Sequence, residues 1–403
     1  MKVKLPIFCA VTGALAGIVF WLFLFLINRG TWLLWDLIPG RLSGFKAYPF
    51  ILCTAGGIII GIVRMLLGDY PEDMMTVFRK LKKEKTYPYK KLPTIIICAL
   101  LPLIFGASVG PEAGMVGVVA ALCCFAADAM KLAKNRSEEY SRIGAAAILS
   151  VIFRSPLFGI LDAGENEGEG PGGTSKIILY CIATGSGFGS LFLMNTIFMK
   201  VSEGFPSFDA ISAGAADYLL FVPYLLCGII LGAFFSGSES VFERIGHSMP
   251  PVAGETIAGA LLGAVASFLP VICFSGEEQM GVLIRDYAKY APLAMIGMAF
   301  LKIIMTNLCI SLGLKGGHFF PLIFSAVCLG YGTALLIFPG DAAHATFAAA
   351  VVAAGTLGVT MKKPLAVSML LLLCFPASAL LWVVPASALA SWAGMKLTGK
   401  QHD

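Results

Sequence analysis

One carboxylate, Glu112, stands at a point in the sequence where an ionised group should be rare. It follows a glycine-rich stretch, Gly-Ala-Ser-Val-Gly-Pro at 106–111, and it opens an apolar run over 113–127. Glycine permits positive φ angles and close backbone approach, so neighbouring N–H groups can point at a ligand. A helix that begins here adds four unpaired N–H groups and about half a positive charge. These residue types predict a helix start that attracts anions.

A second stretch of the same kind occupies residues 313–321, with the sequence Gly-Leu-Lys-Gly-Gly-His-Phe-Phe-Pro. If both stretches open helices near the middle of a membrane, their N–H groups form a dry anion site that needs no buried Lys or Arg. Partial charges of this kind hold an anion weakly enough to release it, which suits permeation.

The carboxylate of Glu112 has two interpretations. In the first, it sits on the helix N-terminus as an intramolecular anion, competes with a transported anion and therefore acts as a gate. In the second, it caps the helix and has no part in transport. The matching position of the second stretch carries Phe319-Phe320-Pro321 and no acid. This asymmetry favours a gate on one side of the site.

The composition indicates a membrane protein. Of the 403 residues, 58% are hydrophobic and only 13% are charged, and the mean hydropathy is +0.85. Soluble domains carry about 25% charged residues. At about 20 residues per crossing, roughly 10–14 membrane-embedded helices would fit. The numbers exclude a disordered chain, a collagen, a nucleic-acid-binding domain and a secreted disulfide scaffold. They predict an all-α, polytopic integral membrane protein surrounded by lipid.

An internal repeat organises the chain. The first glycine-rich stretch, taken together with Glu112, Ala113 and Gly114, ends at 114, and the second stretch ends 207 residues later at 321. Two further pairs keep a spacing of 207 or 208 residues: 153–157 with 361–365, and 68–72 with 275–279. Three pairs in register predict a single transmembrane domain, 1–403, built from two homologous halves of about 1–200 and 205–403.

Hydropathy predicts the helices and their orientation. Basic residues cluster at 79–91, and the positive-inside rule places this segment in the cytoplasm together with both termini. The expected helices are 6–27, 48–67, 93–105, 115–133, 143–161, 177–199, 217–236, 252–274, 292–313, 319–338, 345–362 and 364–394.

Enzyme chemistry finds no support in the sequence. It contains no His-Glu-x-x-His, no Gly-x-Ser-x-Gly and no pair of catalytic acids within a predicted span. The four histidines are scattered, which argues against a histidine-built metal centre, and no cofactor or ATP motif occurs. Gly-Ser-Gly-Phe-Gly at 185–189 lies inside an apolar helix, where small residues serve helix packing. A conventional secondary transporter of an organic solute stays open as the alternative to an anion-transport protein.

The motifs quoted above resemble those of the CLC family of chloride channels and anion/proton exchangers. The resemblance rests on Gly-Ala-Ser-Val-Gly-Pro-Glu-Ala-Gly, Ser-Pro-Leu-Phe-Gly-Ile-Leu, Gly-Gly-His-Phe-Phe-Pro and Lys-Pro-Leu, in this order over nearly the whole chain. It is nearest to a short bacterial ion-transport branch without cytoplasmic CBS domains. It implies an inverted-repeat helical fold, a homodimer with one pore per subunit in a bacterial inner membrane, and chloride or a similar small anion as substrate.

The resemblance also assigns roles to residues. Glu112 matches the family's gating glutamate, and the backbone amides of His318 and Phe319 match its central anion-binding pair. Gly110, Ala113, Gly114 and Gly317 complete the expected anion site, mainly through backbone amides. The family's coordinating serine falls at Gly68, so its hydroxyl is missing. Its internal proton-transfer glutamate falls at Asn166, between Glu165 and Glu167, which makes these three residues the candidate proton path.

Overall fold

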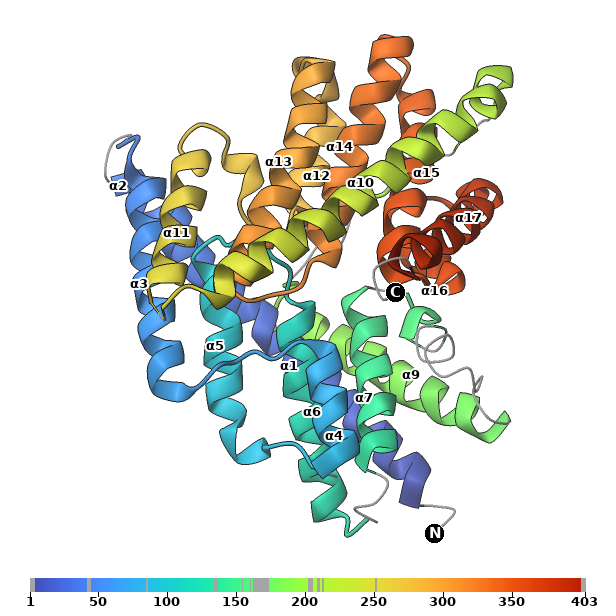
Figure 1. Ribbon diagram of the computed structural model, residues 1–403. Helices are drawn as coiled ribbons and strands as arrows, with labels where there is room; N and C mark the ends of the chain where they lie inside the picture. Colours follow the sequence, from blue (N-terminus) through green and yellow to red (C-terminus); the bar gives the residue numbers. More distant parts are fainter. Residues whose placement is uncertain are drawn as a thin grey trace.

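The computed structural model describes residues 4–41, 45–84, 86–132, 137–153, 155–159, 161, 174–201, 206–208, 211, 214–250 and 252–399. This part of the chain is helical, with short connections and one isolated β-bridge (Figure 1). The helices are α1 (Lys4–Thr31), α2 (Ile38–Arg41), α3 (Tyr48–Leu67), α4 (Met74–Glu84), α5 (Leu92–Ile104), α6 (Glu112–Ala129), α7 (Ser137–Ile152), α9 (Thr174–Ile197), α10 (Ala215–His247), α11 (Ala253–Ala266), α12 (Glu277–Asp286), α13 (Pro292–Ser311), α14 (Phe319–Ile337), α15 (Ala342–Met361), α16 (Pro364–Leu371) and α17 (Leu380–Gly399).

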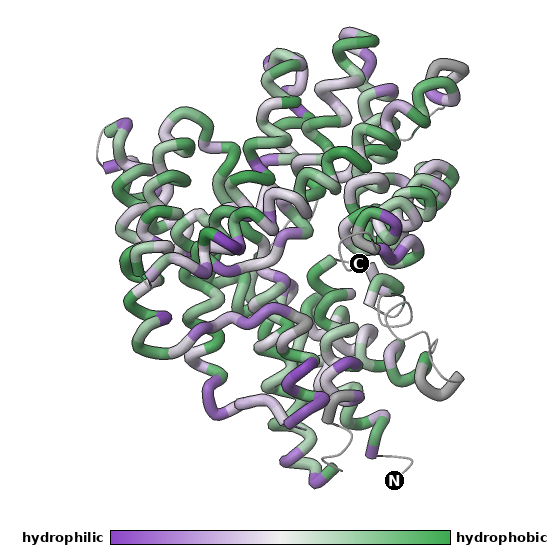
Figure 2. The backbone as a smooth tube through the Cα atoms, viewed as in Figure 1, coloured by the Kyte–Doolittle hydropathy of each residue, from purple (hydrophilic) through white to green (hydrophobic). Residues whose placement is uncertain are grey.

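The helices form a bundle with an apolar exterior. Nine helical segments of the described chain are long and apolar enough to cross a membrane. Their outward side chains are large and apolar, as at Leu219 and Phe192, whose exposed fractions are 79% and 73%. Hydrophobic residues predominate along the helices (Figure 2). Water would make so much exposed apolar surface costly, whereas lipid tails match it. The prediction of a polytopic helical membrane protein is confirmed.

Glycines let pairs of helices approach closely. A Cβ added at Gly17 of α1 would collide with the backbone of α9, and one added at Gly57 of α3 would collide with the backbone of α11. Helix contacts in membranes depend on such small residues, because lipid supplies no hydrophobic drive for association. These contacts make α1 with α9 and α3 with α11 two tightly packed pairs.

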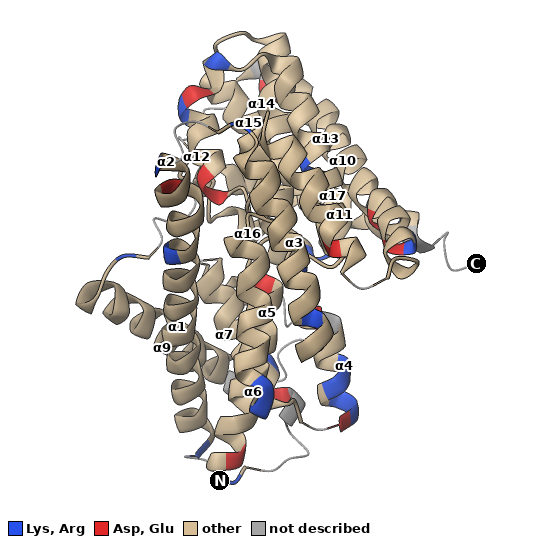
Figure 3. Ribbon diagram, turned by 90° about the vertical axis from the view of Figure 1, so that its left-hand side faces the viewer, with Lys and Arg blue, Asp and Glu red and all other residues tan. Residues whose placement is uncertain are grey.

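Charged residues lie mainly away from the middles of the long helices (Figure 3). Helix α4 is amphipathic: Val77 and Leu81 are fully buried, whereas Lys82 and Lys83 belong to its basic last turn. In Figures 1 and 3, α4 lies at the end of the molecule where α1 begins. The side of the membrane that this end faces stays a prediction.

Several predicted helix limits are wrong for identifiable reasons. The helix expected at 217–236 continues to His247, because polar residues lower hydropathy without interrupting helical hydrogen bonding. The segment 364–394 divides into α16, which ends at Leu371, and α17, which begins at Leu380, because the chain between them turns through Pro376 and a short 3₁₀ turn at Ala377–Ala379. The helix expected at 252–274 ends at Ala266.

A buried polar network ties α10 to α15. His344 lies between Asp217 and Tyr224: its Nδ1 is 2.6 Å from the Asp217 carboxylate and its Nε2 is 2.7 Å from the Tyr224 hydroxyl. The exposed fractions are 5%, 5% and 1% for His344, Asp217 and Tyr224, so these polar groups satisfy one another away from solvent. The network fixes the start of α15 against α10.

Candidate anion site

Two segments far apart in the sequence meet at the centre of the candidate site. The N–H of Gly110 donates to the carbonyl of Gly317 at 2.8 Å, and the N–H of Gly317 donates to the carbonyl of Gly110 at 2.7 Å. This pair is the isolated bridge of the fold. Helix α6 begins two residues after Gly110 and α14 begins two residues after Gly317. The structure therefore brings together the two helix starts that the sequence analysis selected.

Glycine is needed on both sides of this bridge. A Cβ added at Gly110 or Gly317 would collide with the side chain of Glu112. Further upstream, Gly106 and Gly313 adopt φ angles of 82° and 104°, a region that favours glycine. The two segments thus turn in the same way and leave room for one carboxylate between them.

The carboxylate of Glu112 occupies the N-terminus of α14. Its Oε1 accepts a hydrogen bond of 2.8 Å from the N–H of Phe319, which lies 207 residues away in the sequence. The residue is 3% exposed, and within the described part of the chain its Oε2 has no hydrogen-bond partner. A buried carboxylate with one unpaired oxygen is held less firmly than a fully bonded one. The group can therefore yield its place to another anion.

Aromatic rings surround the start of α14. The ring of Phe153 packs edge-on against those of Phe319 and Phe320, with centroids 5.7 and 5.3 Å apart. The imidazole of His318 packs beside Phe235 and Phe319, at 5.1 and 4.7 Å. Apolar walls exclude water, which strengthens the electrostatic effect of the helix N-terminus.

The other residues predicted for the anion site and the proton path do not all lie beside Glu112. Ala113 and Gly114 form the first turn of α6, and Gly114 also lets α6 pack against Ala99 of α5. Gly68 ends α3 with a φ angle of 109°, so its conformation accounts for glycine at that position. Glu165, Asn166 and Glu167 lie outside the described residues, and the proton path stays a prediction.

Sequence reasoning missed Lys302, which supports the site from α13. This residue is fully buried, and its Nζ donates to the carbonyls of Ile272, Cys273 and Phe274 at 2.8, 3.2 and 2.7 Å. The N–H of Phe274 in turn donates to the carbonyl of Gly106 at 3.1 Å. Lys302 therefore positions the first glycine-rich segment through this connection. A lone lysine in the apolar run of 292–313 was the available signal, since ionisable residues within spans are commonly functional.

Comparison with known proteins identifies the family. The sequence profile described as voltage gated chloride channel matches residues 68–394 of this chain. The chain belongs to the CLC family. Anion transport of the CLC type is therefore its class of function, and the family is not enzymatic.

The relatives and the related structures agree with this membership. YfeO of Escherichia fergusonii, which is named as an ion-transport protein, is 26% identical over 319 residues, covering 74% of this chain and 71% of its own. The structure of a slow cyanobacterial Cl⁻/H⁺ antiporter superposes with a TM-score of 0.81 at 15% identity, over 98% of this chain and 95% of that one. The structure of a CLC-type fluoride/proton antiporter gives 0.78 at 19% identity, over 97% and 95%. At these identities the structures establish the CLC fold and leave the substrate open.

Proposed function

We propose that this protein transports chloride or fluoride through the site between the starts of α6 and α14, with Glu112 as the gate. The observation that carries the proposal is the hydrogen bond from the N–H of Phe319 to the Glu112 carboxylate. A carboxylate held by a helix N-terminus marks a place built for a small anion. When that carboxylate swings away, the N–H groups of His318 and Phe319 receive the transported ion, while the N–H of Gly317 stays bonded to the carbonyl of Gly110.

The same carboxylate supports coupling to protons. While an anion occupies the helix N-terminus, the displaced Glu112 loses its hydrogen bond and faces a negative charge. Both changes favour its protonated form. Glu112 would take up a proton while an anion occupies the helix N-terminus and release it when its carboxylate returns there. In such a cycle the proton and the anion move in opposite directions. Glu165, Asn166 and Glu167 are the proposed continuation of that proton path.

The proposed assembly is a homodimer in a bacterial inner membrane, with both termini in the cytoplasm. The basic face of α4 supports this orientation, because Lys and Arg beside membrane spans are retained on the cytoplasmic side (Figure 3). Cysteine introduced at Lys83 should resist an impermeant thiol reagent added to intact cells. Labelling from outside would reverse the proposed orientation.

Flux from proteoliposomes tests the function. Efflux of chloride and of fluoride is recorded together with the internal pH, with protein-free vesicles as the control. Anion efflux accompanied by proton uptake at a constant ratio indicates an exchanger, whereas efflux without pH change indicates a channel. Failure to move any small inorganic anion, combined with uptake of an organic solute, would overturn the proposal.

A further inference from the structure

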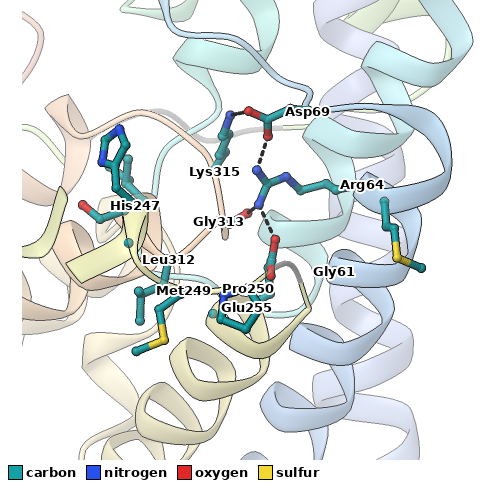
Figure 4. Close-up of a pocket in the computed structure, with 15 residues that line it drawn as sticks. Gly61, Arg64, Asp69, His247, Met249, Pro250, Glu255, Leu312, Gly313 and Lys315 are labelled. Carbon is teal, nitrogen blue, oxygen red and sulfur yellow. Dashed lines mark hydrogen bonds and ion pairs between the residues drawn. The ribbon is translucent and has the colours of Figure 1, made fainter. Parts of the chain in front are cut away.

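A pocket of about 540 Å³ is lined by charged side chains (Figure 4). The ends of α3 and α10, the start of α11 and the turn after α13 form its walls. Four charged side chains line it: Arg64, Asp69, Glu255 and Lys315. Neither the proposed gate nor the proton path uses these residues.

Arg64 holds two carboxylates in different surroundings. One is Glu255, whose side chain is only 6% exposed, and the other is Asp69, whose side chain is 67% exposed. Arg64 also donates to the carbonyl of Gly313 at 2.9 Å. Glu255 is thus a fixed internal partner of the guanidinium, while Asp69 reaches it from the open side of the pocket.

Lys315 shares the same exposed carboxylate. Its Nζ lies 2.7 Å from Oδ2 of Asp69, and its own side chain is 27% exposed. Two cations therefore converge on one solvated acid (Figure 4). Burial acts to raise the pKa of Asp69, but hydrogen bonds from Lys315 and Arg64 hold it below its ordinary value. Asp69 accordingly stays ionised at neutral pH.

The pocket is connected to the site by a short piece of chain. Lys315 precedes Gly317 by two residues and Phe319 by four, and an extended chain spans at most about 3.5 Å per residue. The Cα atoms of Lys315 and Phe319 are therefore within roughly 14 Å of each other. The pocket and the start of α14 are therefore neighbours along the chain, with Lys315 belonging to the same glycine-rich segment as Gly317.

We propose that the pocket is a second, side-chain-built site for a small monovalent anion, in which the anion replaces the carboxylate of Asp69 between Arg64 and Lys315. While no anion is bound, the carboxylate of Asp69 pairs with both Arg64 and Lys315; we call this carboxylate the latch. Exposed ion pairs contribute little to stability, so a dissolved anion can compete for the cations. Glu255 cannot be displaced in this way because it is buried against Arg64. The inference rests on the proposed transport function and adds the site from which the anion reaches the gate.

Charge variants test the pocket. Asp69→Asn removes the latch and should lower the half-saturating chloride or fluoride concentration for flux by about fivefold, the effect of one unit charge about 4 Å away in water. Lys315→Gln should raise it by a similar factor, and Lys315→Arg should restore it. The matched controls are Asp286→Asn and Lys289→Gln, which remove the charges of an exposed ion pair outside the pocket. Both controls should leave the half-saturating concentration unchanged.

A second measurement separates this inference from the proposed function. Calorimetric titration of the purified protein with sodium chloride and with sodium fluoride reports anion binding even where flux is absent. If wild-type protein transports anions but Asp69→Asn and Lys315→Gln shift neither half-saturation nor the binding constant, the pocket inference is wrong and the function stands. If neither the wild-type protein nor the variants transport anions, the proposed function is wrong. The pocket inference then stands only if Asp69→Asn and Lys315→Gln shift the calorimetric binding constant.

Discussion

Neutralising Glu112 is the most direct perturbation of the proposed gate. A charge-assisted hydrogen bond contributes about 1.5–3 kcal/mol, and a helix N-terminus adds about 0.3–1 kcal/mol for a nearby anion. Glu112→Gln keeps a neutral acceptor worth about 1 kcal/mol. The closed position should therefore lose about 1–3 kcal/mol, which corresponds to about 5- to 150-fold in the closed-to-open ratio.

Because Oε2 of Glu112 has no hydrogen-bond partner, the loss of closed-state stability in Glu112→Gln should lie near the lower end of that range. Burying an ionised oxygen without a donor opposes the closed state, and Gln does not carry that cost in full. We expect anion flux at neutral pH to rise about tenfold in Glu112→Gln, which corresponds to about 1.4 kcal/mol. Wild-type flux should itself rise as the pH falls, because protonation removes the same charge. The variant should be nearly independent of pH and, in an exchanger, should no longer move protons.

The assay is anion efflux from proteoliposomes at acidic and neutral pH, with an ion-selective electrode outside and a pH dye inside. Glu243→Gln is the control, because it makes the same chemical change at an exposed position of α10. Size-exclusion chromatography in detergent shows whether each variant folds. Equal and equally pH-dependent flux in wild type and Glu112→Gln would reduce the carboxylate to a helix cap and refute the reasoning.

Three further changes address the surroundings of the gate. Gly317→Ala places a methyl group against the Glu112 side chain, so the carboxylate should be displaced and flux at neutral pH should rise; unchanged flux in a folded variant would contradict the geometry. Lys302→Met leaves three carbonyls without their shared donor and should lower the free energy of unfolding by about 3 kcal/mol or more, seen as a lower thermal midpoint in detergent. His344→Ala removes the hydrogen bonds of His344 with both Asp217 and Tyr224 and should lower the free energy of unfolding by about 2–5 kcal/mol. Anion flux per folded molecule should stay near that of wild type.

The helix starts at the site could be predicted because their determinants are local. Glycines followed by an apolar run define where α6 and α14 begin, and the spacing of the two motifs indicated that they belong together. The hydrogen bond of Glu112 then follows from the cost of leaving a carboxylate unpaired at the start of a span. Helix starts, and the residues placed at them, can thus be predicted from residue types within a few positions of each other.

The features that sequence reasoning missed depend on contacts between distant segments. Arg64 pairs with Glu255 from α11, and no local pattern joins these two residues. Helices α4 and α12 are short and polar, so a search for apolar runs passes over them. Lys302 was visible as an isolated charge, but its role depends on the path of the chain at 272–274, which hydropathy does not report.

The bridge between Gly110 and Gly317 has a consequence for biosynthesis. Translation adds about 5–20 residues per second, so Phe319, which lies 207 residues after Glu112, is added roughly 10–40 s later. During that interval the Glu112 carboxylate has no helix start to receive it, and exposure to lipid would be costly. The nascent first part of the chain must therefore keep this carboxylate protonated, or in contact with water or the insertion machinery, until α14 arrives. The hydrogen bond between Glu112 and Phe319 therefore cannot form until the start of α14 is made, and a ribosome that stalls before Phe319 leaves behind a membrane-inserted fragment whose Glu112 has no helix start to bind.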